Sequence, residues 1–427
     1  MSTPREVPSG PEADPPAQHA SIDSAGVTGV VSTLGTTLPP SSGYSTLNGT
    51  LHERMAIRFT GSGSEYFRIW IVNLLLILVT GGFYFPWAKV RRLRYFHGNT
   101  LVAGQPLGFH GDPKKMLRGF LLVALLGGLY SVAGQFSPVA GLVAFVIVAL
   151  IWPALFKASL QFRLANTSWR GLRFRFNGSV GGAYRALLPL FVPSAVIVAG
   201  VAAVPDQLHP PHWFDALMFS TMGLTALLLP LLIWNLKKYQ HGHYAFAQLQ
   251  TELRAGLGAF YALCLKSLGV FVLAGVIAGV VITALAYGLG HNLVEVAGGR
   301  ANRTAMMVFG FVIIFGTLLM VQALAMPYFT SRLQNLLWSR TGNSQLRFKS
   351  QLRFRSLLRV TLLNWLLMVV TLGLYWPFAR VALARLRLES VSVVSRITPD
   401  ALVAQASQGG DAAGDAAADL FGLDIGL

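Results

Sequence analysis

Apolar runs alternate with short polar loops along most of the chain. A helix of about twenty apolar residues is long enough to cross the ~30 Å hydrocarbon core of a bilayer, and runs approaching that length recur between residues 51 and 390. The pattern predicts an all-α polytopic membrane protein, with six to eight transmembrane segments in a membrane domain of residues 51–390. The predicted segments lie near 66–86, 116–136, 138–156, 184–204, 214–236, 266–288, 304–327 and 357–378.

The loops between these segments differ sharply in charge. Loops 87–118, 157–185, 237–266 and 328–359 are rich in Lys and Arg, whereas the connections near 131–138, 205–215 and 288–304 contain few basic residues. Since basic loops are retained in the cytoplasm, we expect the basic loops to be short amphipathic cytoplasmic segments. The other connections are then expected to face outward.

The basic loops also resemble one another, which indicates an internal repeat. Asn99-Thr100 and Asn166-Thr167 occupy the same place in two of them, and a Phe-x-Gly motif follows ten residues after each Asn, at Phe109 and Phe176. Alternating apolar and basic residues at 172–178 predict a short amphipathic strand or extended edge before the next helix.

The first and last apolar segments are similar to each other. Arg68–Arg94 and Arg359–Arg385 are identical at twelve of 27 positions without a gap, and both contain a Thr-x-Gly-x-Tyr break. We predict that each consists of two half-spanning helices that return to the cytoplasmic side, with the broken backbone covered by protein. This leaves six full spans and both termini in the cytoplasm. The alternative is one tilted helix from about 66 to 88 that crosses the membrane, which would place both termini outside.

Composition supports a membrane location and predicts two disordered tails. The chain is 53% hydrophobic and only 12% charged, about half the charged fraction of a soluble domain. The net charge of +17 resides mainly in the loops, where attraction to anionic phospholipid explains it better than nucleic acid does. Residues 1–50, rich in Ser, Thr, Pro and Gly, and 391–427, rich in Ala, Gly and Asp, are predicted to be disordered tails. A single cysteine, Cys264, excludes an intramolecular disulfide.

Several motifs together resemble a known family. They are "FTGSGSEYFRIWIVNLLL" at 59–76, "TGGFYFPWAKVRRLRYFHGNT" at 80–100, "GFHG" at 108–111, "KKYQHGHYAF" at 237–246 and "RLQNLLWSRT" at 332–341. The sequence resembles the YjgN family of bacterial inner-membrane proteins, a family of unknown function. The resemblance covers about 55–390 and implies a multi-pass protein of a bacterial inner membrane. It implies no activity, substrate or catalytic residue.

Polar residues within the terminal segments form one candidate site. Spacings of seven and four residues would place their side chains along one helical stripe in each segment. Such a stripe could form packing contacts between helices or line a substrate path between corresponding broken helices. The residues are Asn73, Thr80, Tyr84, Asn364, Thr371 and Tyr375.

Basic residues interleaved with aromatic residues form a second candidate site. This composition is typical of an interfacial segment that contacts anionic lipid headgroups. The candidate lipid contacts are Arg91, Arg92, Arg94, Arg173, Arg175, Arg353 and Arg355.

The sequence offers little support for catalysis or metal binding. His97, His241 and His243 lack neighbouring Cys or carboxylate ligands at metal spacing, and the usual enzymatic motifs are not found. We therefore expect no enzyme activity, metal or cofactor. The favoured function is a scaffold or anionic-lipid-binding protein of the inner membrane, with protein partners unidentified. The alternative is a passive or facilitated transporter or channel for a small solute that could be anionic.

Overall fold

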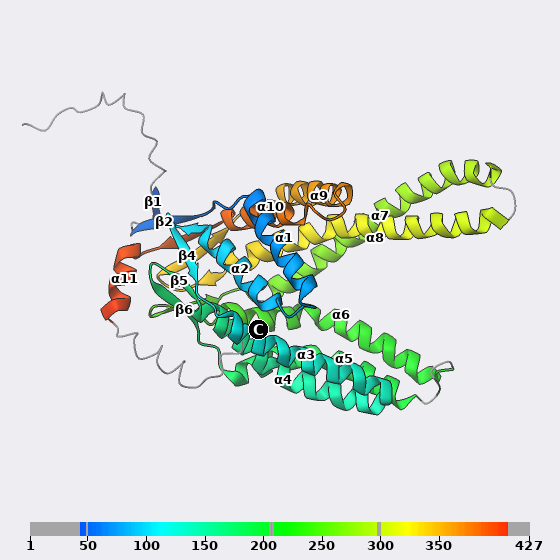
Figure 1. The fold of residues 1–427 in the computed structure, drawn as a ribbon, viewed down its shortest axis with the longest axis horizontal. Helices are drawn as coiled ribbons and strands as arrows, with labels where there is room; N and C mark the ends of the chain where they lie inside the picture. Colours follow the sequence, from blue (N-terminus) through cyan, green and yellow to red (C-terminus); the bar gives the residue numbers. More distant parts are fainter. Residues whose placement is uncertain (1–42, 48–49, 205, 207–208, 297–299, 409–427) are drawn as a thin grey trace, which may run out of the picture. The chain divides into compact units, whose positions relative to one another are not determined.

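The apolar segments form long helices in a computed structural model of the chain (Figure 1). The structure describes all residues except 1–42, 48–49, 205, 207–208, 297–299 and 409–427. Among the described residues, six helices are long and apolar enough to cross a membrane. This result confirms the predicted all-α polytopic class. These helices are α3 Pro113–Phe136, α4 Pro138–Ala165, α5 Val180–Ala203, α6 His212–His241, α7 Leu257–Val296 and α8 Arg300–Ser339.

The first and last apolar segments are helical hairpins rather than single rods. Helix α1, Gly63–Val79, is followed by α2, Phe85–Gly98, and α9, Phe354–Val370, is followed by α10, Trp376–Glu389. A helix of 17 residues such as α1 is about 25 Å long at 1.5 Å per residue, short of a ~30 Å hydrocarbon core. The sequence therefore located the breaks correctly.

Each break is stabilised by its threonine. The Thr80 hydroxyl donates to the Leu76 carbonyl at 2.7 Å and accepts the Tyr84 backbone N–H at 3.0 Å. Thr371 makes the same two hydrogen bonds, with Leu367 and Tyr375. The glycine of the motif has φ of +95° at Gly82 and +89° at Gly373, a conformation that residues with a Cβ rarely adopt. The Thr-x-Gly-x-Tyr motif thus forms a tight turn between two helices.

The basic loops form an unexpected twelve-stranded sheet in the order β8-β7-β6-β5-β4-β3-β2-β12-β11-β10-β9, with β1 beside β2. The sequence predicted only the strand within 172–178. The strands are β1 Gly43–Leu47, β2 Thr50–Phe59, β3 Thr100–Val102, β4 Gln105–Phe109, β5 Thr167–Trp169, β6 Leu172–Phe176, β7 Tyr244–Phe246, β8 Leu249–Gln250, β9 Glu252–Leu253, β10 Thr341–Gly342, β11 Leu346–Ser350 and β12 Val391–Ser395.

The hydrogen-bonded strands form a ring. Strands β8 and β9 stand at the two ends of the hydrogen-bonded order, yet only Thr251 separates them in the chain. The chain itself therefore joins the two ends. The Asn343 side-chain amide strengthens this junction by donating to the Gln250 carbonyl at 3.2 Å.

The ring is built from a repeated strand–helix–helix–strand unit. In every unit the strand that precedes the helices pairs antiparallel with the strand that follows them, so the helices leave the sheet and return to it. The units are β2-α1-α2-β3, β4-α3-α4-β5, β6-α5-α6-β7, β9-α7-α8-β10 and β11-α9-α10-β12. The sequence repeat detected in the loops therefore extends to five units, which include α1 to α10, and the helices of the first and last units are shorter.

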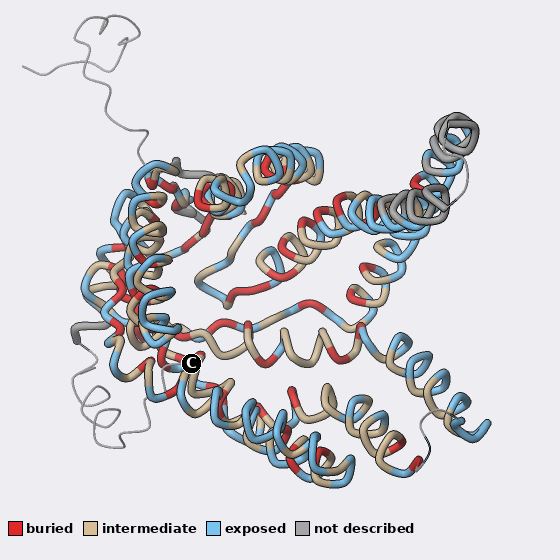
Figure 2. Tube along the Cα trace, turned by 45° about the vertical axis from the view of Figure 1, so that its right-hand side comes forward, coloured by how far each residue is buried: buried red, intermediate tan, exposed pale blue. Residues whose placement is uncertain are grey.

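Helices of neighbouring units contact one another in the same cyclic order. The second helix of each unit packs against the first helix of the next, and the last unit closes on the first through α10 and α1. Trp376 of α10 lies against Tyr66 and Trp70 of α1, with ring centroids 6.4 and 5.9 Å apart. Figure 2 shows buried segments along the strand ring and mostly exposed or intermediate residues along the helices.

The Phe-x-Gly motif packs the start of a unit against its own returning helix. A Cβ built on Gly178 would lie 2.4 Å from the Phe176 ring and 2.7 Å from the Tyr239 hydroxyl, so only glycine fits. Gly61 and Gly111 are enclosed in the same way by Phe59 and Phe109. The glycine of the repeated motif therefore allows the phenylalanine ring and a side chain of the returning helix to pack closely.

The predicted boundaries of the two tails need correction. Residues 391–395 form β12 and Pro399–Gln408 form helix α11, so the prediction of disorder from 391 onward is wrong for these elements. Strand β1 likewise lies within 1–50. The short run "VSVVS" gains its partners from β2 and β11, which composition could not indicate. The remaining tail residues, 1–42 and 409–427, lie outside the described residues.

The packing at Gly178 gives a first prediction. Replacing Gly178 by Ala should force Phe176 or Tyr239 to move and lower the free energy of unfolding by about 1–3 kcal/mol, as overpacking usually does. Thermal unfolding in detergent measures the effect. Gly181→Ala is the matched control, because nothing lies within 4 Å of a Cβ there. Equal stability of both variants would contradict the packing role.

The hairpins give a second prediction, about sidedness. In a Cys264→Ser background, single cysteines at Ser64 and Gly98 flank the α1–α2 hairpin and should react with a membrane-impermeant maleimide from the same side of the membrane. A cysteine at Gln135, near the α3–α4 connection, should react from the opposite side. Labelling of Ser64→Cys and Gly98→Cys from opposite sides would show that this segment crosses the membrane.

Candidate functional site

The strand ring contains a cavity that the sequence did not predict. It has a volume of about 470 Å³, within the roughly 300–1,000 Å³ range of small-ligand sites. Strands from four of the five repeat units and three returning helices contribute to its wall, and no lining residue is acidic. The β9-α7-α8-β10 unit contributes Trp338 of α8 and Asn343, which follows β10. The lining includes Met55, Ile57, Val102, Leu107, Phe109, Trp169, Phe174, Phe246, Leu346, Phe348 and Val393.

Strand alternation makes the inside of the ring apolar and its outside basic. Side chains of successive strand residues point to opposite faces. Leu346 and Phe348 of β11 line the cavity, while Arg347 between them is exposed. Met55 and Ile57 line it from β2, while Arg54 and Ala56 are exposed. The same periodicity that the sequence showed at 172–178 therefore forms an apolar chamber with a cationic outer surface.

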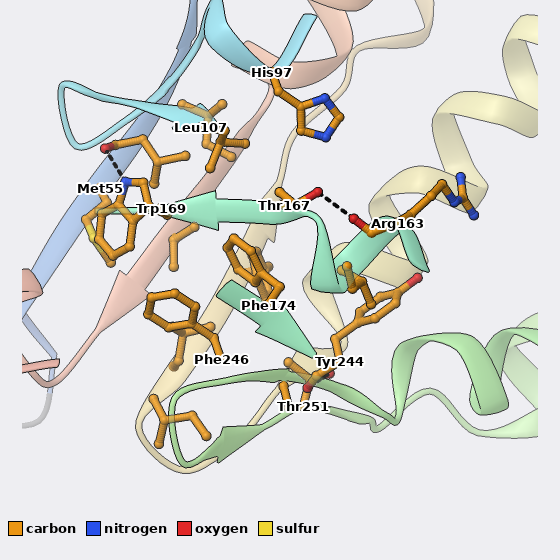
Figure 3. A pocket seen from close by; sticks show the side chains of 18 of the residues that line it. Met55, His97, Leu107, Arg163, Thr167, Trp169, Phe174, Tyr244, Phe246 and Thr251 are labelled. Atoms are coloured by element: carbon orange, nitrogen blue, oxygen red, sulfur yellow. Dashed lines mark hydrogen bonds between the residues drawn. The ribbon is translucent and has the colours of Figure 1, made fainter. Parts of the chain in front are cut away.

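Aromatic side chains hold the chamber wall. The Trp169 indole N–H donates to the Val102 carbonyl at 3.1 Å, which fixes the ring orientation across two strands. Phe246 contacts both Trp169 and Phe174, with centroid distances of 5.7 and 4.8 Å. Figure 3 shows these rings gathered on one side of the cavity.

Helix α11 covers the end of the ring that is remote from the membrane helices. Leu402 of α11 lines the cavity and is only 1% exposed. Asp400 forms an ion pair with Arg170 in the β5–β6 turn, and the Arg170 guanidinium also lies 5.3 Å above the Trp169 ring. Because β5 runs away from α4, that turn marks the ring end opposite the helices. A segment predicted to be disordered, which lies beside the strands in Figure 1, thus covers this end of the cavity.

Polar groups occupy the other end of the cavity, where the helices return. Arg163, in the last turn of α4, lines the cavity but is exposed. In Figure 3 its guanidinium points away from Trp169 and Phe246. Tyr244 lies beside it: burial raises the pKa of the Tyr244 phenol, which the cationic Arg163 offsets only in part. The Tyr244 hydroxyl is therefore a hydrogen-bond donor at neutral pH.

His97 completes this polar end in a neutral form. Burial lowers the pKa of the His97 imidazole; the hydrogen bond to Leu93 opposes this change, and Arg163 adds to it. Its Nδ1 lies 2.8 Å from the Leu93 carbonyl, which can only accept, so Nδ1 carries the proton. The only positive charge that lines the cavity, among the described residues, is thus Arg163.

The three histidines considered for metal binding are held by separate contacts. His241 Nδ1 lies 3.2 Å from the Thr341 hydroxyl, and the His243 Nδ1 lies 2.8 Å from the Tyr239 carbonyl. Within the described part of the chain, no group of three or more His, Cys, Asp or Glu side chains could hold a metal ion.

The predicted polar stripes are discontinuous, because each helix ends before its threonine. Asn73 and Asn364 are buried, and the Asn364 side-chain amide donates to the Ala379 carbonyl of α10 at 3.5 Å. Thr80 and Thr371 lie in the turns. Tyr84 stacks on Trp87, and Tyr375 stacks on Phe378. None of these residues lines the cavity.

The predicted lipid-contact arginines are distributed around the ring and the short hairpins. Arg91 lies 5.8 Å above the Tyr84 ring, Arg94 donates to the Gly111 carbonyl and Arg175 donates to the Ala247 carbonyl. Arg92 is half-buried in α2. The remaining residues are exposed, on the outer face of β6 for Arg173 and around the start of α9 for Arg353 and Arg355. The structure does not gather them into one site.

Sequence similarity gives a family but no activity. A family model described as "Bacterial protein of unknown function (DUF898)" matches residues 54–420. The inner membrane protein YjgN of Salmonella typhimurium is 32% identical over 143 residues, which cover 33% of this chain and 36% of the relative. YjgN of Escherichia coli K12 is 28% identical over 172 residues, covering 40% of this chain and 43% of the relative.

These alignments span less than half the length of either relative. No solved structure is significantly similar to the chain. The family match nevertheless covers most of the chain, including all the strand–helix–helix–strand units except the first residues of β2. Together with the apolar helices, the relatives support a location in a bacterial inner membrane. The chain belongs to the DUF898 family, and its predicted membership of the YjgN family of inner membrane proteins of unknown function is confirmed.

Proposed function

We propose that this inner membrane protein binds lipid, with one acyl chain held inside the strand ring. The observation that carries the proposal is the apolar cavity of about 470 Å³, which the ring encloses next to the membrane helices. Burial of apolar surface contributes about 25 cal/mol per Å², so a hydrocarbon chain is the ligand that such a wall favours. A polar solute would find few hydrogen-bond partners there.

The cationic outer surface supports the same function. Exposed arginines on β2, Arg54 and Arg58, face away from the cavity. Basic groups close to a bilayer attract anionic headgroups by about 1 kcal/mol each. The proposal therefore includes anionic phospholipid contacts at the predicted arginines, a ring on the cytoplasmic side, and both termini in the cytoplasm.

The role we propose is binding rather than catalysis. The Ser168 hydroxyl lies 2.8 Å from His110 Nε2, a pair that could suggest a nucleophile and its base. However, among the described residues no carboxylate contacts His110, and Ser168 is buried between inward-facing neighbours of β5. The arrangement lacks the third group that would orient the base.

A third prediction tests whether the cavity holds the ligand. Leu107→Trp places a larger side chain in the cavity and should reduce binding of a fluorescent fatty acid by the purified protein at least tenfold, with less lipid co-purified. Ala56→Trp, on the outer face of β2, is the matched control and should bind normally. Binding that is unchanged in Leu107→Trp, in a protein of normal thermal stability, would exclude the cavity as the binding site.

One observation favours passage of a small anion as a second candidate function. The helices and strands close in the same cyclic order, and the cavity lies within that ring, with Arg163 at one end and α11 covering the other. A cationic mouth and an apolar constriction are features that channels use for selectivity and gating.

A fourth prediction tests this second candidate. Passage requires α11 to leave the ring, so Leu402→Ala combined with Asp400→Asn should increase chloride flux into proteoliposomes several-fold over the unmodified protein. Arg347→Gln, which changes an outer-face charge, is the control. If the flux stays at the level of protein-free liposomes in every variant, passage of an anion is excluded and lipid binding remains the proposed function.

A further inference from the structure

The geometry points to an anionic amphiphile as the ligand of the ring cavity, with its headgroup bound between the Arg163 guanidinium and the Tyr244 hydroxyl. This inference rests on the proposed binding of an acyl chain and specifies the chemistry of the other end of the ligand. The shared headgroup chemistry is a carboxylate or phosphate oxygen. The hydrocarbon chain would extend from the helix end of the cavity towards Trp169 and Leu402.

The first argument is the position of Arg163. It lines an apolar cavity yet remains exposed, so its guanidinium stands at an opening rather than inside the wall. Among the described residues, no carboxylate forms an ion pair with it and its side chain makes no protein hydrogen bond. A planar guanidinium with five N–H donors fits the paired oxygens of a carboxylate or phosphate.

The second argument comes from the equivalent arginine in another unit. Arg163 lies four residues before Thr167, and Arg387 lies four residues before Val391, at the same place relative to the first residue of the returning strand. Arg387 is used in packing, because its Nε donates to the Gln334 side chain at 2.8 Å. An arginine at this position of the repeat can therefore be used in packing, and the fold does not require its guanidinium to stay free. Binding of a ligand would account for the free guanidinium of Arg163.

The third argument is the presence of a second donor. Tyr244 shares the cavity wall with Arg163, and Figure 3 shows its ring beneath the arginine, with the hydroxyl directed towards the same end. Within the described part of the chain, this hydroxyl has no hydrogen-bond partner. Because its pKa is raised by burial, it keeps its proton and can donate to an anion. His97, neutral and bonded to Leu93, adds no repulsion or charge.

The test compares two ligands that differ only in the headgroup. Hexadecanoate and hexadecanol compete for the purified full-length protein in nonionic detergent at pH 8, with a fluorescent fatty acid as the reporter. A hydrogen bond to a charged group contributes enough for at least a tenfold preference for the acid. Arg163→Gln should lose this preference while its affinity for hexadecanol remains. Arg163→Lys should restore part of it, and Tyr244→Phe should reduce it.

Matched controls separate this inference from the proposed function. Arg347→Gln removes the same charge from the outer face of β11 and should keep the full preference for hexadecanoate. Equal binding of acid and alcohol by the unmodified protein would overturn the headgroup site while leaving acyl-chain binding intact. Failure of both ligands to bind would instead overturn the proposed function, and this inference with it.

Inorganic phosphate distinguishes a lipid headgroup from a free anion. Millimolar phosphate should displace neither ligand, because the chain supplies most of the affinity. Displacement of hexadecanoate by phosphate, lost in Arg163→Gln, would show that the site takes a free anion and would overturn the amphiphile.

Discussion

The structure depends on one kind of interaction, the antiparallel pairing between the strand that precedes each helix pair and the strand that follows it. Phe59 lies opposite Thr100 across the first pair of helices, and Ser350 lies opposite Val391 across the last. This pairing forces every helix pair to return to its starting side, whether the helices are long enough to cross a bilayer or not. The long helices and the short terminal hairpins can therefore belong to the same repeated arrangement, with the strands at one end of every helix pair.

Closure of the strands into a ring has a second consequence. In an open sheet one face can remain in water, but a closed ring turns all the inward side chains towards a shared interior. Here the alternating pattern places aromatic and aliphatic residues inside and arginines outside. The ring is too wide for these side chains to fill, so an apolar cavity remains. The cavity is therefore a product of strand number and alternation, and the proposed lipid binding follows from its apolar wall.

The chain also departs from its own repeat where the proposed function lies. Three units share the Phe-x-Gly packing, and two of them share the Asn-Thr pair at the end of the returning helix. By contrast, Arg163 differs in its contacts from Arg387 at the equivalent place, and α11 has no counterpart in the described part of the other units. Features common to the units maintain the architecture. Features found once close the cavity at one end and provide a cation at the other.

Sequence alone determined the local features, because each depends on residues that are close together in the chain. Apolar run length gave the six long helices, and the Thr-x-Gly-x-Tyr motif gave the helix breaks, since both the threonine hydrogen bonds and the glycine backbone conformation are local. Alternation at 172–178 indicated one strand of the ring. The similarity of the basic loops indicated a repeat, although not its strand–helix–helix–strand form.

Only the tertiary structure decided the ring, its cavity and the order of residues 391–408. Strands β3 and β5 contain three residues each, too few to show a period, and β12 pairs with β2 at the other end of the described chain. The partners of such strands are distant in sequence, so hydropathy and composition cannot reveal them. The polar stripes predicted in the terminal segments are interrupted at Thr80 and Thr371, and none of their residues lines the cavity. In the sequence, Arg163 is one of many basic residues in the loop 157–185. Only the ring shows that it lies at the opening of an apolar cavity.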